Sequence, residues 1–132
     1  MLQKKILVPI GNNSSDLKSI HYALSLAERL QAQVFILQQK RTGNPSHAAD
    51  IWRDEALSDL INSARRSGIF VSYHIAEGTL RQGMLDLAKE EHIHVLVFGE
   101  NDGVDDTLLN RLRPLVTSQI IQVRGKNYIN YL

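Results

Sequence analysis

The segment Val95–Thr107, VLVFGENDGVDDT, joins the end of a buried strand to an acidic loop. Its first four residues are all apolar, as expected of a strand covered on both faces of a sheet, and Gly99 follows them directly. In an open α/β sheet, an anionic ligand binds at this point, beyond the carboxyl end of the strand. The seven residues after Gly99 carry four carboxylates and no Lys or Arg, and these charges would repel a phosphate group. The segment therefore predicts a nucleotide-binding scaffold that has lost its phosphate site.

On both sides of this segment, short apolar runs alternate with long amphipathic stretches. The apolar runs predict strands at Lys5–Ile10, Gln33–Gln39, Ile69–Ile75, His94–Phe98 and Ser118–Val123. The amphipathic stretches predict helices at Asp16–Leu30, Ala48–Ser67, Thr79–Glu91 and Thr107–Val116. Strands that alternate with helices need crossover connections, and crossovers produce parallel sheets. We therefore predict an α/β fold of the Rossmann-like or flavodoxin-like type: a three-layer sandwich with a five-stranded parallel sheet and about four helices.

Length and composition indicate one domain, with an α/β part at residues 1–124 and a C-terminal tail at 125–132 that we expect to be docked. The net charge of +1 in 132 residues gives no field that would attract nucleic acid, and we expect no nucleic-acid partner. No apolar run approaches the ~18 residues needed to cross a bilayer, so no membrane insertion is expected. The absence of cysteine excludes disulfides and thiolate metal sites, and a cytoplasmic location is predicted.

The titratable residues form no recognisable catalytic or metal-binding pattern. Five histidines are scattered along the chain, and no Asp or Glu completes a compact ligand set around any pair of them. Asp102, Asp105 and Asp106 lack the alternate spacing of a calcium loop, which favours a solvated loop. We find neither a nucleophile–base pair nor a phosphate cradle. The sequence therefore predicts a protein that is not an enzyme, with no metal and no cofactor.

The last predicted strand is expected to be an edge of the sheet. Its outer side would be unpaired, and the run Gln119, Ile120, Ile121, Gln122 and Val123 is apolar enough to need covering. We therefore predict a homodimer that forms through this strand. The tail Gly125–Leu132 is rich in large apolar and aromatic residues, and we expect it to dock on its own domain or across the dimer.

In this order and spacing, four segments resemble the universal stress protein (UspA-like) family. They are KKILVPI, ALSLAERLQAQVFIL, ARRSGIFVSYHIAEGTLRQGMLDLAKEEHIHVLVFG and TSQIIQV. The resemblance is weakest at Lys40–Asp54 and absent from Gly125–Leu132. It implies the strand order 3-2-1-4-5, homodimers that commonly pair through strand five and, in one subclass, ATP held above the carboxyl ends of strands one and four.

The sequence departs from that ATP-binding subclass at both of its motifs. The subclass has an acidic residue directly after strand one, where this chain has Gly11. It also has a Gly-x2-Gly-x9-Gly-Ser/Thr loop after strand four, where Asp102 takes the place of the second glycine and Asp106-Thr107 that of the final pair. The loop is about six residues short. The resemblance therefore implies the subclass that lacks the ATP-binding motif.

We accordingly predict a universal-stress-type regulatory protein that acts as a homodimeric interaction module with an unknown protein partner. The alternative is a sensor of a small molecule or nucleotide that uses the crevice between strands one and four. The residues predicted to line that crevice are Pro9, Gly11, Asn12, Gln39, Gly99, Glu100 and Thr107.

Overall fold

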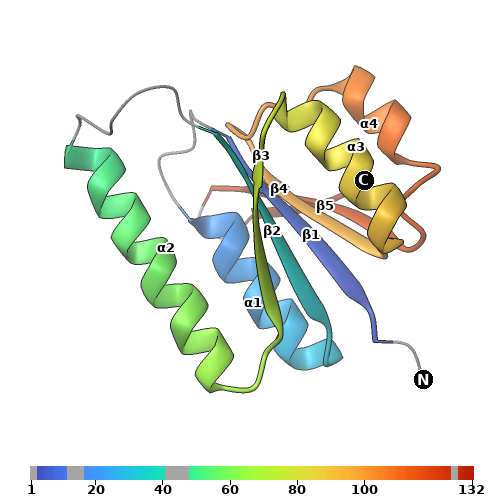
Figure 1. Ribbon diagram of the computed structural model, residues 1–132. Coiled ribbons are helices and arrows are strands. Elements are labelled where there is room, and N and C mark those ends of the chain that lie inside the picture. Colours follow the sequence, from blue (N-terminus) through green and yellow to red (C-terminus); the bar gives the residue numbers. More distant parts are fainter. Residues whose placement is uncertain (1–2, 12–16, 41–47, 126–127) are drawn as a thin grey trace.

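The computed structural model describes residues 3–11, 17–40, 48–125 and 128–132, which form six strands and four helices (Figure 1). In chain order these elements are β1 (Lys5–Ile10), α1 (Lys18–Leu30), β2 (Gln33–Gln39), α2 (Ala48–Arg66), β3 (Val71–Ala76), α3 (Leu80–Glu91), β4 (Val95–Gly99), α4 (Asp106–Leu112), β5 (Gln119–Arg124) and β6 (Tyr128–Tyr131). The strict alternation through β5 confirms the α/β fold class. No helix in the described part of the chain is both long and apolar enough to cross a membrane.

All six strands belong to one sheet in the order β3-β2-β1-β4-β5-β6. The first five strands are parallel and have the predicted order 3-2-1-4-5. The sixth strand was not predicted, and it runs antiparallel to β5. The prediction of five strands is therefore one short, because the tail adds a strand to the sheet by doubling back at Gly125, which has a positive φ of 60°.

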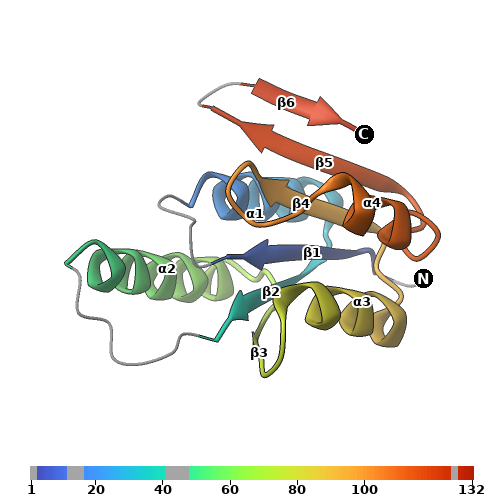
Figure 2. The ribbon, with the colours of Figure 1, turned by 90° about the horizontal axis from the view of Figure 1, so that it is seen from above.

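The sheet lies between two layers of helices, as predicted (Figure 2). On one face, α1 and α2 pack over a cluster that includes Ile6, Val8 and Ile36, and on the other α3 and α4 pack over a cluster that includes Leu7 and Phe98. Successive residues of β1 thus point to opposite faces, and both faces are buried. This double burial explains why β1 is apolar along its whole length.

Strand β6 covers the side of β5 that the sequence analysis left open. Ile121, Gln122, Val123 and Arg124 pair with Tyr131, Asn130, Ile129 and Tyr128, and Leu132 N–H donates to the Ile120 carbonyl at 2.8 Å. Ile129 also packs against the cluster beneath α1. The expectation of an unpaired outer edge at Gln119, Ile120, Ile121, Gln122 and Val123 is therefore wrong over most of its length, because the chain's own tail takes that edge.

Candidate functional site

The candidate site lies beyond the carboxyl ends of β1 and β4. Helix α1 leaves the carboxyl end of β1 toward one face of the sheet and α4 follows the carboxyl end of β4 on the other face, so these two strand ends form the switch point at which such sheets bind ligands. The two strands pair only at Ile6–Val95 and Leu7–Leu96. Two residues further along β1 stands Pro9, which has no N–H to offer a neighbouring strand. The backbone pairing between the two strands therefore ends after Leu7.

The side chain of Asp102 fills the floor of this crevice. Gly99 N–H donates to Asp102 Oδ2 at 2.6 Å, and Gly11 N–H donates to Asp102 Oδ1 at 3.3 Å. Asp102 is only 2% exposed. Backbone N–H groups at the ends of strands are the donors with which such sites hold phosphate. In this chain an internal carboxylate accepts those hydrogen bonds.

Two glycines make the close approach of Asp102 possible. A Cβ on Gly11 would lie 3.2 Å from the Cα, carbonyl carbon and carbonyl oxygen of Asp102. A Cβ on Gly99 would lie 3.1 Å from Asp102 Oδ2. The glycine after strand one and the aspartate in the loop therefore pack directly against each other, and an acidic residue at position 11 would require this loop to shift.

Two other carboxylates of the acidic loop also have partners within the chain. Arg124 Nε lies 3.4 Å from Glu100 Oε1. Asp105 caps α4 by accepting from Leu108 N–H at 2.8 Å, and Arg81 Nη1 lies 2.9 Å from its other oxygen. The Leu108 N–H bond, followed by the Arg81 contact, lowers the pKa of Asp105 from its ordinary value of 3.8. The loop is acidic by composition, and its charges serve to hold it in place.

Asp102 separates two cavities. The larger, about 440 Å³, lies toward α3 and is lined by Gly11, Gln39, Thr79, Leu80, Arg81, Met84, Asn101, Asp102 and Gly103. The smaller, about 240 Å³, lies toward α1 and β5 and is lined by Lys18, Ser19, Gly99, Glu100, Asn101, Asp102, Val123 and Gly125. Asn101 and Asp102 contribute to both linings, so this part of the loop forms the wall between them.

The structure distributes the predicted crevice residues over these two cavities. Gly11 and Gln39 line the larger cavity, and Gly99 and Glu100 line the smaller one. Asn12 lies outside the described residues.

The other two predicted crevice residues line neither cavity. Pro9 is buried within β1, and Thr107 is exposed in the first turn of α4. Thr107 therefore does not supply a hydroxyl to the crevice.

The decisive residue, Asp102, was predicted to lie in a solvated loop, and that prediction is wrong because its side chain is buried against backbone donors. One sequence signal was present: Asp102 precedes Gly103, which has a φ of 76°, and Asp-Gly pairs mark tight turns. Arg81 and Thr79, which line the larger cavity from the start of α3, were also missed.

Three of the five histidines take structural positions. His92 ends α3 with a positive φ of 53°, His94 Nδ1 accepts from Lys5 N–H at 3.0 Å, and His74 stacks on Phe35. Within residues 3–11, 17–40, 48–125 and 128–132, no three His, Asp or Glu side chains are grouped so that they could hold a metal ion.

Comparison with known proteins agrees with this architecture. A model described as "Universal stress protein family" matches residues 3–122. No curated protein is significantly similar to the chain in sequence.

Solved structures of this family share the fold at low sequence identity. The universal stress protein from Archaeoglobus fulgidus in complex with dAMP has a TM-score of 0.59 and 19% identity, over 92% of this chain and 98% of that one. A universal stress protein in complex with cAMP has a TM-score of 0.64 and 14% identity, over 96% and 100%. A family member from Arabidopsis thaliana with AMP bound has a TM-score of 0.56 and 15% identity, over 94% and 93%.

Proposed function

This chain belongs to the universal stress protein family, and from that premise we propose that it is a regulatory binding protein that does not hold ATP in the usual mode. The proposal is carried by Asp102, whose carboxylate accepts from Gly99 N–H and Gly11 N–H. A phosphate group at this place would have to displace the carboxylate and then lie among the remaining loop charges. We propose no catalytic step for the protein, and a cytoplasmic location stays a prediction.

We propose that its output is recognition of a protein partner, with self-association as a homodimer. Since β6 pairs with β5, the edge at this end of the described sheet is β6, where Tyr131 is 63% and Leu132 37% exposed. Edge strands with apolar side chains are suited to pairing between copies. Light scattering at micromolar concentration tests this: a dimer is expected, and a strict monomer would overturn the homodimer.

A thermal-melt panel tests the absence of usual ATP binding. The ligands are ATP, ADP, AMP and adenosine, each with and without Mg²⁺. A ligand at 100 times its dissociation constant stabilises a protein by about 2.7 kcal/mol. For a domain of this size the melting temperature would rise by roughly 3–6 °C. We expect no shift with ATP and Mg²⁺ at millimolar concentration, and a shift of that size would overturn the proposal.

The variant Asp102→Gly sharpens this test, since it restores the Gly-x2-Gly spacing after β4 and frees the N–H groups of Gly11 and Gly99. We expect it to gain a melting shift with AMP or inorganic phosphate that the wild type lacks. Glu100→Gln is the matched control, because it removes a charge from the same loop without freeing a backbone donor. If both variants respond equally, charge rather than occupation of the donors excludes phosphate.

A second candidate function is a sensor of a nucleoside-like molecule. The 440 Å³ cavity is within the range of small-molecule sites, and Gln39, Thr79 and Arg81 give it polar groups. Relatives of the same fold have been solved with dAMP, cAMP and AMP. A melting shift with adenosine alone, and none with ATP, would favour this function over the first.

A further inference from the structure

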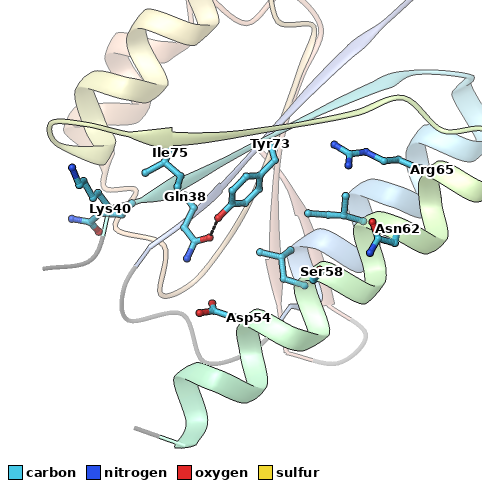
Figure 3. A pocket seen from close by; sticks show the side chains of 11 residues that line it. Gln38, Lys40, Asp54, Ser58, Asn62, Arg65, Tyr73 and Ile75 are labelled. Carbon is cyan, nitrogen blue, oxygen red and sulfur yellow. Dashed lines mark hydrogen bonds between the residues drawn. The ribbon is translucent and has the colours of Figure 1, made fainter. Parts of the chain in front are cut away.

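A third cavity, away from the switch point, lies between α2 and the sheet (Figure 3). It measures about 570 Å³, which is the volume of a typical small-molecule site. One wall is the face of α2 that carries Leu57 and Ile61, and the other is formed by the ends of β2 and β3. Figure 1 shows the cause: α2 approaches β3 at its C-terminal end, and its N-terminal end stands away from the sheet.

Apolar side chains on β3 lie exposed in this opening. Val71, Tyr73 and Ile75 alternate onto the face of the sheet that α1 and α2 cover. Val71 is buried there, but Tyr73 is 39% and Ile75 51% exposed, and both line the cavity. With Leu57 and Ile61 opposite, these two side chains form an apolar slot with an aromatic ring on one side.

The amide of Gln38 places a hydrogen-bond donor inside the slot. Gln38 is 8% exposed, and its Oε1 accepts a hydrogen bond from the Tyr73 hydroxyl. Figure 3 shows the Gln38 amide directed into the cavity. Its Nε2 has no hydrogen-bond partner among the described residues. A ligand that fills the slot would remove water from this amide, and an acceptor on the ligand is favoured because an unmade hydrogen bond is costly once the donor is buried.

Two of the three charged side chains that line the slot lie beside an opposite charge. Lys40 Nζ lies 3.1 Å from Glu77 Oε2, at the end of the cavity formed by β2. At the other end, Arg65 donates from Nη2 to the Val71 carbonyl at 2.8 Å and from Nε at 3.2 Å. Asp54 has Arg53 Nη2 4.0 Å away. Arg65 keeps its charge, but the Val71 carbonyl takes its Nε and Nη2 donors, so a charged ligand would lose its hydration for little direct compensation, which favours a neutral one.

We propose that this cavity binds a small uncharged aromatic molecule whose carbonyl or ring acceptor takes a hydrogen bond from Gln38 Nε2. The aromatic ring lies in the slot against Tyr73, where ring pairs gain from stacking, and opposite Leu57 and Ile61. This site is separate from the crevice at β1 and β4, so the proposal stands or falls independently of nucleotide binding.

Three probes with one ring and different charges test the proposal: benzamide, benzoate and benzylamine. Each is titrated into isotope-labelled protein to about 10 mM, the range in which so small a ligand binds. We expect benzamide to bind most tightly and to shift backbone amide signals of α2, β2 and β3 around the cavity. The absence of any shift, or tighter binding of benzoate or benzylamine, would overturn the proposal.

Variants on α2 locate the binding. Ser58 is exposed and lines the cavity, so Ser58→Trp fills the slot from its open side without entering the core. Ser63→Trp is the matched control, because Ser63 is exposed on the same helix and does not line the cavity. We expect Ser58→Trp to weaken benzamide binding at least about tenfold and Ser63→Trp to leave it unchanged. Equal effects of the two variants would contradict the assigned site.

Gln38→Leu tests the hydrogen bond, with the amide spectrum as a check that the variant folds. Benzamide is expected to lose affinity relative to toluene, which has the same ring and no acceptor. If Gln38→Leu weakens both probes equally, the amide plays no part in recognition and the proposed chemistry is wrong. If that variant does not fold, Tyr73→Phe takes its place, since it leaves Gln38 present and removes the hydroxyl that orients it.

Discussion

Gly11 and Asp102 lie in direct contact. A Cβ on Gly11 would lie 3.2 Å from the Asp102 backbone, and Gly11 N–H donates to the Asp102 carboxylate at 3.3 Å. One departure from the ATP-binding pattern thus makes room for the other. The two residues, 91 positions apart in the chain, act as a single structural substitution.

Replacing Asp102 by Asn should destabilise the fold by about 1–3 kcal/mol, because an amide can accept from only one of the two backbone donors and turns an N–H toward the other. Urea unfolding measures the change. Asp59→Asn, at an exposed position of α2, is the control and should stay close to wild type. Similar losses for the two variants would contradict the role given to the Asp102 hydrogen bonds.

Gly11→Ala should cost about 1–3 kcal/mol, because the added methyl group meets backbone that cannot turn away. Gly78→Ala is a matched control, since a Cβ at that position meets nothing within 4 Å. Adding Asp102→Gly to each variant completes a double-mutant cycle. A coupling energy is expected for Gly11 and not for Gly78. Additive costs at both positions would show that Gly11 and Asp102 are independent.

Ile129→Asp should undock β6, because it places a charge against the cluster under α1. The outer edge of β5 would then be open, and we expect concentration-dependent association into species larger than the dimer proposed for the wild type. Light scattering over a concentration series measures it. Asn130→Asp, on the opposite face of the same strand, is the control. Unchanged association of Ile129→Asp would show that β6 does not shield β5 in solution.

The pKa of Asp105 predicts an acid-dependent loss of stability. Its value in the folded protein is lowered, first by the Leu108 N–H bond and then by Arg81. A lowered folded pKa gives a stabilisation that is complete above the unfolded value, near 3.8, and that is lost as the pH falls through the folded value. Carboxyl NMR titration and acid unfolding of the wild type and of Asp105→Asn measure this contribution.

Arg81→Gln should raise the pKa of Asp105 only in part, since the Leu108 N–H bond stays in place. Arg111→Gln, in the same helix as Leu108, is the control and should leave that pKa unchanged. A pKa of Asp105 that does not respond to Arg81→Gln would show that the ion pair is not formed in solution.

The order of strands and helices could be predicted because apolar periodicity reports burial directly. Lys5–Ile10 and Gln33–Gln39 are predicted with the bounds that the structure has. Strand β3 begins at Val71 and not at Ile69, because Gly68 has a φ of 90° and Phe70 is exposed before pairing starts. Strand β6 was missed because four residues after a turn carry too short a pattern to distinguish a strand from a docked tail.

The site was harder to predict because it depends on where the side chains of the acidic loop point, and the composition of the loop does not show this. The count of loop carboxylates predicts repulsion of phosphate, but it does not reveal that Asp102 turns inward while Glu100 and Asp105 turn outward to arginines. The cavity beside Tyr73 depends on the angle of α2 to the sheet, which local sequence does not encode.

The buried position of the Asp102 side chain also affects whether an anionic metabolite can stabilise the protein. A fold whose anion site is emptied and refilled by a metabolite gains or loses stability as that metabolite rises or falls. Here the anion in the site is the carboxylate of Asp102. Because it is part of the chain, the site is occupied from the moment the chain folds. Under the proposed function, a change in the concentration of ATP therefore does not alter the stability of this protein through this site.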